Sequence, residues 1–160
     1  MKAYLGLGSN ILPEANLTAA ADLLREEWPD IRFSAVYRSK AMEHADQADF
    51  LNAAAVVDID RDAESIHRKL KQIEEALSKD VAFRFGPRTI DIDLLLYGDT
   101  VMESAELTLP HPRMHQRRFV LEPLCELIDP KTRHPALGKT WKELLEATND
   151  QQCERVKLKL

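Results

Sequence analysis

Cysteine and long apolar runs are both scarce in this 160-residue chain. Only Cys125 and Cys153 occur, and because they lie far apart without a Cys-x-x-Cys pair, neither a disulfide framework nor a cysteine-based zinc site is indicated. The apolar stretch 1–7 ends at Gly8-Ser9-Asn10, which makes it too short for a signal peptide or a membrane span. We therefore expect a cytoplasmic protein with reduced thiols and no membrane contact.

An excess of basic charge is also absent, because 22 Lys and Arg stand against 27 Asp and Glu and give a formal net charge of -5. A general nucleic-acid-binding protein needs a broad basic surface. We therefore expect no nucleic-acid partner, and any bound anion must meet a local cluster of basic residues.

Two nucleotide-binding motifs are missing as well: residues 6–11 lack the third glycine of the dinucleotide fingerprint, and no P-loop sequence occurs. We interpret residues 6–10 mainly as a tight turn between a strand and a helix, and close approach of their backbone to a ligand is the alternative.

The chain does contain a mixture of apolar periodicities. The period changes several times between two and about 3.6, which is typical of a mixed α and β domain. Hydrophobic residues make up 44% of the chain and charged residues 31%, and there is no internal repeat. This length and composition fit one compact domain over residues 1–160, which we expect to be a monomer.

The periodicity predicts a definite order of strands and helices. Pro13, after Ser9-Asn10, marks the start of a helix, and Asp60 or Asp62 is placed to cap the next one. We expect strands at 2–8, 31–38, 50–59 and 89–97, and helices at about 13–28, from Asp60 or Asp62 to about 78, at 117–127 and at 141–147. The order of the first six elements suits an α+β, ferredoxin-like split β-α-β sandwich with helices packed on a mainly antiparallel sheet. The periodicity alone leaves other α+β arrangements open.

The strongest chemical signal lies in the expected strand at 89–97. Residues two apart in a strand face the same side, so Asp91 and Asp93 point together. The other face carries apolar residues that we expect in the core: Ile90, Ile92, Leu94 and Leu96. Two ionised carboxylates repel each other unless a cation neutralises them, and Mg²⁺ prefers oxygen ligands. We therefore predict a magnesium site at Asp91 and Asp93, while a salt bridge with Arg88 remains the structural alternative.

Arginine supplies all the basic residues between positions 84 and 118: Arg84, Arg88, Arg113, Arg117 and Arg118. Guanidinium groups match phosphate oxygens in a bidentate way, so we expect a phosphate-bearing ligand. His111 lies between two prolines that fix its direction, and it could donate to a phosphate oxygen; a surface-loop histidine is the alternative. A zinc site at His111 and His115 is only weakly indicated, because Pro112 blocks a helix there.

An aromatic residue and a side-chain amide share one face of the expected strand at 50–59. Phe50 and Asn52 are two residues apart, so their side chains point the same way. An aromatic ring stacks on a flat heterocycle, and an amide both donates and accepts hydrogen bonds. Phe119 could supply a second stacking surface. These residues predict a heterocycle site, and the structural alternative is a strand start with Asn as its turn residue.

Four stretches together resemble one known family. They are YLGLGSN at 4–10, QADFLN at 47–52, GPRTIDIDL at 86–94 and LPHPRMHQR at 109–117, followed by a matching segment at 119–124. Their order and spacing resemble 6-hydroxymethyl-7,8-dihydropterin pyrophosphokinase of folate biosynthesis over nearly the whole chain. The resemblance implies a ferredoxin-like fold, ATP as the donor and a hydroxymethyl dihydropterin as the acceptor. It further implies attack on the β-phosphorus of ATP and release of AMP.

The same resemblance implies roles for individual residues. Paired Mg²⁺ ions map to Asp91 and Asp93. Contacts with ATP map to Glu74, Arg84, Arg88, Leu94, Thr108, His111 and Arg117. We expect Arg88, His111 and Arg117 to be catalytic, because they would meet the charge that develops as AMP leaves. Contacts with the pterin map to Ser39, Met42, Phe50, Asn52 and Phe119.

Two segments depart from the family pattern. Residues 39–43 lack the Pro and Gly that usually shape the pterin loop. Residues 77–83 carry one base and one acid, Lys79 and Asp80, where the family usually shows Gly-Arg-x-Arg. We expect the second segment to act as a weak lid over the phosphates. The alternatives are therefore a non-catalytic or weakly active nucleotide- or pterin-binding paralogue and, as a third hypothesis, a Mg²⁺-dependent phosphohydrolase.

Overall fold

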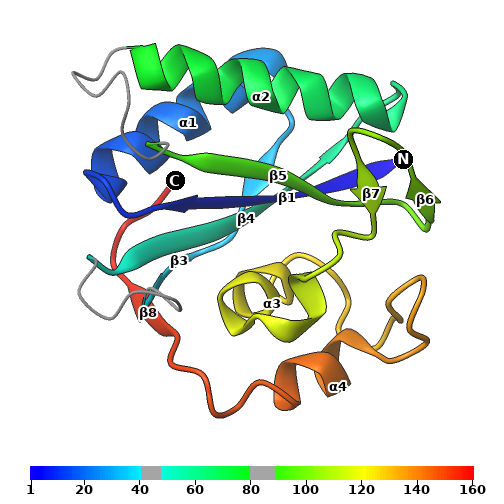
Figure 1. The fold of residues 1–160 in the computed structure, drawn as a ribbon. Helices are drawn as coiled ribbons and strands as arrows, with labels where there is room; N and C mark the ends of the chain where they lie inside the picture. Colours follow the sequence, from blue (N-terminus) through cyan, green and yellow to red (C-terminus); the bar gives the residue numbers. More distant parts are fainter. Residues whose placement is uncertain (41–47, 80–88) are drawn as a thin grey trace.

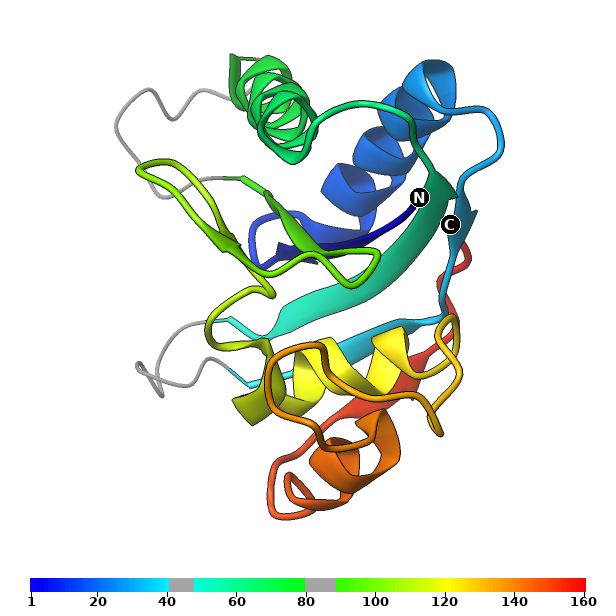
Figure 2. The ribbon, with the colours of Figure 1, turned by 90° about the vertical axis from the view of Figure 1, so that its right-hand side faces the viewer.

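One antiparallel sheet lies between two layers of helices (Figures 1 and 2). The computed structural model of the chain describes residues 1–40, 48–79 and 89–160. The helices are Pro13–Glu27 (α1), Ala63–Lys79 (α2), Arg118–Leu124 (α3) and Trp141–Glu146 (α4). Figure 2 shows α1 and α2 on one face of the sheet and α3 and α4 on the other. Within the described ranges, no helix is long and apolar enough to cross a membrane.

The order of the strands identifies the fold. The strands of the sheet are Lys2–Ser9 (β1), Arg32–Phe33 (β2), Val36–Ser39 (β3), Phe50–Asp58 (β4), Asp91–Tyr97 (β5) and Glu154–Val156 (β8). Their order is β5-β1-β4-β3-β8, with β2 also pairing with β4, and all these pairs are antiparallel. In each helical crossover, another strand separates the two strands that the helix joins, which is the split β-α-β arrangement. The predicted ferredoxin-like α+β fold is confirmed.

Two apolar clusters hold the helices to the sheet. The cluster beneath α1 and α2 contains fully buried Leu5, Leu17 and Ile66. The cluster beneath α3 and α4 is smaller and contains fully buried Leu121 and Trp141. The second cluster covers only part of its face of the sheet. On the uncovered part, the end of β1 and the starts of β4 and β5 line a cavity.

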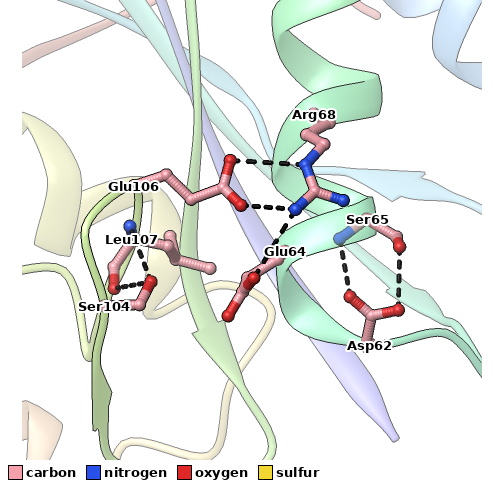
Figure 3. Close-up of polar contacts among 7 residues, drawn as sticks. All are labelled: Asp62, Glu64, Ser65, Arg68, Ser104, Glu106 and Leu107. Carbon is pink, nitrogen blue, oxygen red and sulfur yellow. Dashed lines mark hydrogen bonds and ion pairs between the residues drawn. The ribbon is translucent and has the colours of Figure 1, made fainter.

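The start of α2 has the predicted cap. Asp62 accepts hydrogen bonds from the backbone N–H and the hydroxyl of Ser65, at 2.9 and 2.8 Å (Figure 3). These bonds hold the pKa of Asp62 below its usual range. One turn later, Arg68 makes a bidentate contact with Glu106 at 2.6 and 3.3 Å, and its guanidinium also lies 3.6 Å from Glu64. This pair joins α2 to the loop between β6 (Met102–Glu103) and β7 (Thr108–Leu109).

The start of α1 differs from the expected signal. Pro13 is the first helical residue as predicted, but the N-cap is Leu12, in a left-handed conformation and without a side-chain cap. The Ser9 hydroxyl does not cap the helix, because it donates to the Thr89 carbonyl oxygen at 2.5 Å and also lies 3.1 Å from the Ile11 carbonyl oxygen. The serine therefore ties the end of β1 to the segment that leads into β5.

Two strand predictions need correction. The expected strand at 31–38 is divided into β2 and β3, because the Ser34 hydroxyl accepts the hydrogen bond of the Ala54 N–H at 2.8 Å and interrupts the regular ladder. In β5, a register shift against β1 lies between Tyr4 and Leu5. Ile90, Ile92 and Leu94 pack in the cluster under α1 and α2 as expected, whereas the shift places Leu96 in the opposite cluster.

Several short elements were not predicted from the sequence. The hairpin of β6 and β7 has strands of two residues each, and a 3₁₀ helix covers Met114–Gln116. The three-residue strand β8 completes the outer edge of the sheet beside β3. Strands this short contain too few residues to show a period, so the pattern of the sequence does not reveal them.

Candidate functional site

A cavity of about 410 Å³ opens on the face of the sheet that carries α3. Its floor comes from β1, β4 and β5, and its wall comes from the end of β3, the segment 111–117 and α3. The predicted site residues that line it are Ser39, Phe50, Asn52, Asp91, Asp93, His111, Arg117 and Phe119. The predicted phosphate, metal and heterocycle residues thus meet in one cavity, although they come from four separate parts of the sequence.

Glycine separates the carboxylates from the amide on the floor of this cavity. In the sheet register, Gly8 lies opposite Asp91 on one side and opposite Asn52 on the other, and Gly6 lies opposite Asp93. Directly paired residues of neighbouring strands point to the same face. A side chain on β1 here would fill the space between the two groups, and a Cβ at Gly8 would approach Asn52 Oδ1 to 3.0 Å. The glycines therefore keep the cavity open where the two sides meet.

The two aspartates stand at the start of β5, which is an edge strand of the sheet. Asp91 is exposed, and the side chain of Asp93 is 43% exposed, so both remain accessible to an ion. The segment before them is anchored by buried Thr89, whose carbonyl oxygen accepts from Ser9 Oγ at 2.5 Å and from Asn16 Nδ2 at 3.4 Å. These bonds fix the point at which β5 begins and so fix the direction of the carboxylates.

Helix α2 covers the outer edge of β5 with one lysine and one glutamate. Glu74, which is 4% exposed, accepts from the Ile92 N–H at 2.6 Å. Lys71 Nζ donates to Glu74 Oε1 at 2.9 Å, to the Ile92 carbonyl oxygen at 3.1 Å and to Asp93 Oδ1 at 3.2 Å. Glu74 was predicted on the nucleotide side, and it lies directly behind the metal candidates. Lys71 was not predicted, and its only sequence signal is the i,i+3 spacing to Glu74.

The wall of the cavity supplies a neutral donor and cations. His111 Nδ1 accepts from the Arg113 N–H at 3.4 Å, which leaves the ring proton on Nε2. Burial lowers the pKa of His111, and nearby Arg117 and Lys71 lower it further, while Asp93 opposes them. The imidazole is therefore uncharged near pH 7 and can donate one hydrogen bond. The guanidinium of Arg117 lies 5.6 Å from the centre of the Phe119 ring, which supports it by a cation-π contact.

The opposite side of the cavity presents an amide, a hydroxyl and aromatic rings, with Lys40 also lining the cavity next to Ser39. Asn52, 4% exposed, donates from Nδ2 to the Ser39 hydroxyl at 2.8 Å. This bond orients the amide so that its oxygen lies toward Gly8. Within the part of the chain that the structure describes, no donor pairs with that oxygen. Phe50 and Phe119 also line the cavity and offer aromatic surface next to this amide.

The remaining predicted residues lie elsewhere. The Leu94 side chain is buried in the cluster under α1 and α2, so only its backbone could meet a ligand. Thr108 lies on β7 and borders a neighbouring hollow that also contains His111, His115 and His134. Arg118 does not line the cavity, because its side chain contacts Glu122 and Asn149. Arg84, Arg88 and Met42, together with the proposed lid from residue 80 onward, lie outside the described residues.

The donor set on β5 suits a hard cation that brings other ligands with it. Among the described residues, no group of three or more His, Cys, Asp or Glu side chains is arranged to hold a metal ion. A closed zinc site needs about four such ligands around one ion, and the described part of the chain does not bring them together. Two carboxylates beside an open cavity do fit Mg²⁺, which commonly binds one or two carboxylates plus substrate phosphates.

Comparison with known proteins gives one consistent family. The family model described as 7,8-dihydro-6-hydroxymethylpterin-pyrophosphokinase (HPPK) matches residues 4–129. A 2-amino-4-hydroxy-6-hydroxymethyldihydropteridine pyrophosphokinase of Aquifex aeolicus is 38% identical over 141 residues, covering 88% of each chain. The protein of the same name from Methylorubrum extorquens is 38% identical over 161 residues, covering 97% of this chain and 98% of its own. That of Bacillus subtilis is 35% identical, covering 96% and 89%.

Solved structures support the fold. The chain resembles the Plasmodium falciparum HPPK-DHPS crystal structure with pteroate, with a TM-score of 0.69 and 18% sequence identity. A second HPPK-DHPS structure, in complex with substrates, gives a TM-score of 0.70 at 13% identity. The matches cover 91% and 93% of this chain but only 42% and 45% of those longer chains. At this identity the likeness concerns the fold, which is the antiparallel α+β sandwich described above.

Proposed function

Because the chain belongs to the 7,8-dihydro-6-hydroxymethylpterin-pyrophosphokinase family, we propose that it transfers pyrophosphate from ATP to the hydroxymethyl group of 6-hydroxymethyl-7,8-dihydropterin in folate biosynthesis. AMP is the second product. The observation that carries this proposal is the single cavity in which Gly8 separates the Asp91–Asp93 pair from the Asn52 amide. We further propose that residues 1–160 act as one catalytic domain, monomeric and in the cytoplasm.

The reaction needs two ligands to meet above one point of the floor. The hydroxymethyl oxygen forms a new bond to the β-phosphorus of ATP, the bond from that phosphorus to the oxygen bridging to the α-phosphorus breaks, and that oxygen leaves with AMP. Phosphoryl transfer of this kind depends mainly on positioning and on charge neutralisation. Gly8 lies between the two sides, so an acceptor held by Asn52 faces a phosphate chain held near Asp91.

Asp91 and Asp93 would hold Mg²⁺ together with the phosphates of ATP.

The wall residues act on the phosphate chain. His111 donates from Nε2 to a phosphate oxygen, and Arg117 meets the negative charge that grows on the leaving AMP. Family resemblance adds Arg84 and Arg88 to this group, with Glu74, Leu94 and Thr108 on the nucleotide side. Among the described residues lining the cavity, no group stands out as a general base for the hydroxymethyl proton.

The acceptor side recognises a flat heterocycle by shape and hydrogen bonds. The Asn52 oxygen is directed toward the cavity by the bond to Ser39, so it is ready to accept an N–H of the pterin ring. Phe50 and Phe119 supply aromatic surface for the faces of the ring. Met42 is the further pterin contact that the resemblance implies.

An assay of AMP release tests the proposal directly. Purified protein is incubated with ATP and Mg²⁺, with and without the hydroxymethyl dihydropterin, and nucleotides are separated by chromatography. The proposal predicts AMP that appears only when the acceptor is present. ADP or inorganic phosphate without an acceptor would instead support a phosphohydrolase. Binding of both ligands without any turnover would support a non-catalytic paralogue.

A further inference from the structure

Lys71 makes an unexpected contact with one of the two metal-candidate carboxylates. Its ammonium group reaches around the edge strand from α2 and lies 3.2 Å from Asp93 Oδ1. The same nitrogen lies 2.9 Å from Glu74 Oε1 and 3.1 Å from the Ile92 carbonyl oxygen. A lysine ammonium has three N–H donors, so these three acceptors use all of them. These three hydrogen bonds therefore hold the positive charge of Lys71 next to the Asp93 carboxylate.

The position of Lys71 is set by packed structure. Its side chain is only 27% exposed, and Glu74 beside it is buried and bonded to the Ile92 N–H. Helix α2 is fixed near its start by the Asp62 cap and by the contact of Arg68 with Glu106 (Figure 3). A lysine held in this way does not sample solvent as an ordinary surface lysine does.

A fixed ammonium at this place opposes a metal ion. A divalent cation on Asp93 would stand within a few ångströms of Lys71, and like charges this close repel strongly at a partly buried site. The phosphates of ATP would add several negative charges on the other side of the ion and offset that repulsion. Metal binding should then be weak before the nucleotide arrives and strong with it.

On the basis of the proposed metal site, we propose that Lys71 is a positioning residue that neutralises Asp93 in the metal-free protein and thereby makes metal binding depend on the nucleotide. The role differs from simple capping of the β5 edge. If Lys71 only satisfied hydrogen-bond acceptors at the edge of β5, it would stabilise the fold and leave metal affinity unchanged. If its positive charge neutralises Asp93, it weakens metal binding in the absence of nucleotide. Metal affinity therefore separates the two roles.

The test is calorimetric titration with Mn²⁺, with and without an ATP analogue whose α,β-bridging oxygen is replaced by methylene. Lys71→Gln removes the charge but keeps an amide that can donate to Glu74 and to the Ile92 carbonyl. We expect it to tighten Mn²⁺ binding without nucleotide by about tenfold, because one nearby like charge is gone. The additional gain from the nucleotide analogue should shrink by a similar factor. Lys71→Arg keeps the charge and should bind Mn²⁺ as the unaltered protein does.

Lys69→Gln is the matched control. It removes one lysine from the same helix, but the Lys69 ammonium pairs with Glu27 at 3.3 Å. It changes the net charge by the same amount, so an effect of overall charge would appear in both variants. We expect Lys69→Gln to leave Mn²⁺ affinity unchanged, and melting temperatures of all variants check that they are folded.

Two results would overturn the inference in distinguishable ways. If Lys71→Gln binds Mn²⁺ no more tightly than the unaltered protein, while Asp93→Asn weakens binding, the metal site stands and the role of Lys71 is refuted. If Asp93→Asn leaves Mn²⁺ binding unchanged both with and without the nucleotide analogue, the metal site of the proposed function fails and the role of Lys71 fails with it.

Discussion

The two sides of Gly8 are built differently. On the β5 side, the exposed Asp91 and the half-exposed Asp93 carry charge at the edge of the sheet. On the β4 side, Asn52 and Ser39 are 4% and 6% exposed, uncharged and already bonded to each other. Charge is therefore kept where ions and solvent can reach it, while neutral groups are buried and oriented in advance. Under the proposed function, the nucleotide side depends on its ligands for completion, whereas the Asn52–Ser39 pair of the acceptor side is already formed.

The largest effect is expected on the charged side. Asp91→Ala or Asp93→Ala should lower kcat by at least about a thousandfold, because the metal loses a ligand and the phosphates lose their neutralising partner. Stability should change little, since Asp91 is exposed, Asp93 is half-exposed, and an ion pair near the surface contributes at most about 1 kcal/mol. Steady-state kinetics and thermal melting measure both quantities. Unaltered turnover in either variant would refute the metal assignment.

A smaller and more selective effect is expected on the preformed side. Asn52→Ala should weaken pterin binding by about 10- to 100-fold, because a buried polar group on the ligand loses its partner. Nucleotide affinity, measured by calorimetry on the same protein, is the internal control and should hardly change. Equal losses for the two ligands would show that Asn52 supports the whole cavity and does not select the pterin.

The glycines between the two sides allow a matched pair of substitutions. A Cβ at Gly8 would press on Asn52 Oδ1 at 3.0 Å, whereas one at Gly6 would meet the Leu95 side chain at 3.3 Å. Gly8→Ala should therefore weaken pterin binding by roughly tenfold, since the amide must shift. Gly6→Ala should disturb the neighbourhood of Asp93 and leave pterin affinity closer to its original value. Equal losses of pterin affinity in Gly8→Ala and Gly6→Ala would argue against two separate sides of the cavity.

The smallest expected effect is proton uptake at His111 when ATP binds. Burial is the main reason that the pKa of His111 is lowered from its usual value near 6.5. At a pH just below 6.5, His111 in the free protein is therefore protonated to a smaller extent than an exposed imidazole would be. Phosphates beside the ring would raise that pKa again. ATP binding near pH 6 should therefore take up a fraction of one proton at this residue and strengthen as the pH falls through this range.

Calorimetry in two buffers of different ionisation enthalpy measures this proton uptake. The contribution of the imidazole is the difference between the unaltered protein and His111→Gln, because protonation of ATP itself is common to both. Pterin binding should show no such difference, because Asn52 lies on the other side of Gly8 from the proposed phosphate site. An equal uptake in the two proteins would place His111 away from the phosphates.

The sequence predicts local patterns better than contacts between elements. Alternation along β5 correctly places Asp91 and Asp93 on one face, and the two-residue spacing does the same for Phe50 and Asn52, because side-chain direction in a strand has a fixed period. Leu96 breaks this pattern only through the register shift against β1, which depends on pairing with another strand. The short strands β6, β7 and β8 carry no usable period.

The candidate site shows the same limit. The pairing of Gly8 with both Asp91 and Asn52 follows from sheet register, which one isolated strand does not specify. The contact of Lys71 with Asp93 depends on how α2 packs against the edge of β5. Neither feature has a local signature beyond the two glycines of β1 and the i,i+3 spacing of Lys71 and Glu74. The predicted roles of Arg84, Arg88 and Met42 remain predictions outside the described residues.

The most direct test of the central claim follows the β-phosphorus itself. ATP labelled with ³²P at the β-position is mixed with excess protein and hydroxymethyl dihydropterin, and the reaction is stopped within one turnover. Transfer of pyrophosphate moves the label entirely to the pterin product, and the AMP then carries none. Label recovered in ADP or in inorganic phosphate, with the pterin unlabelled, would contradict transfer of pyrophosphate.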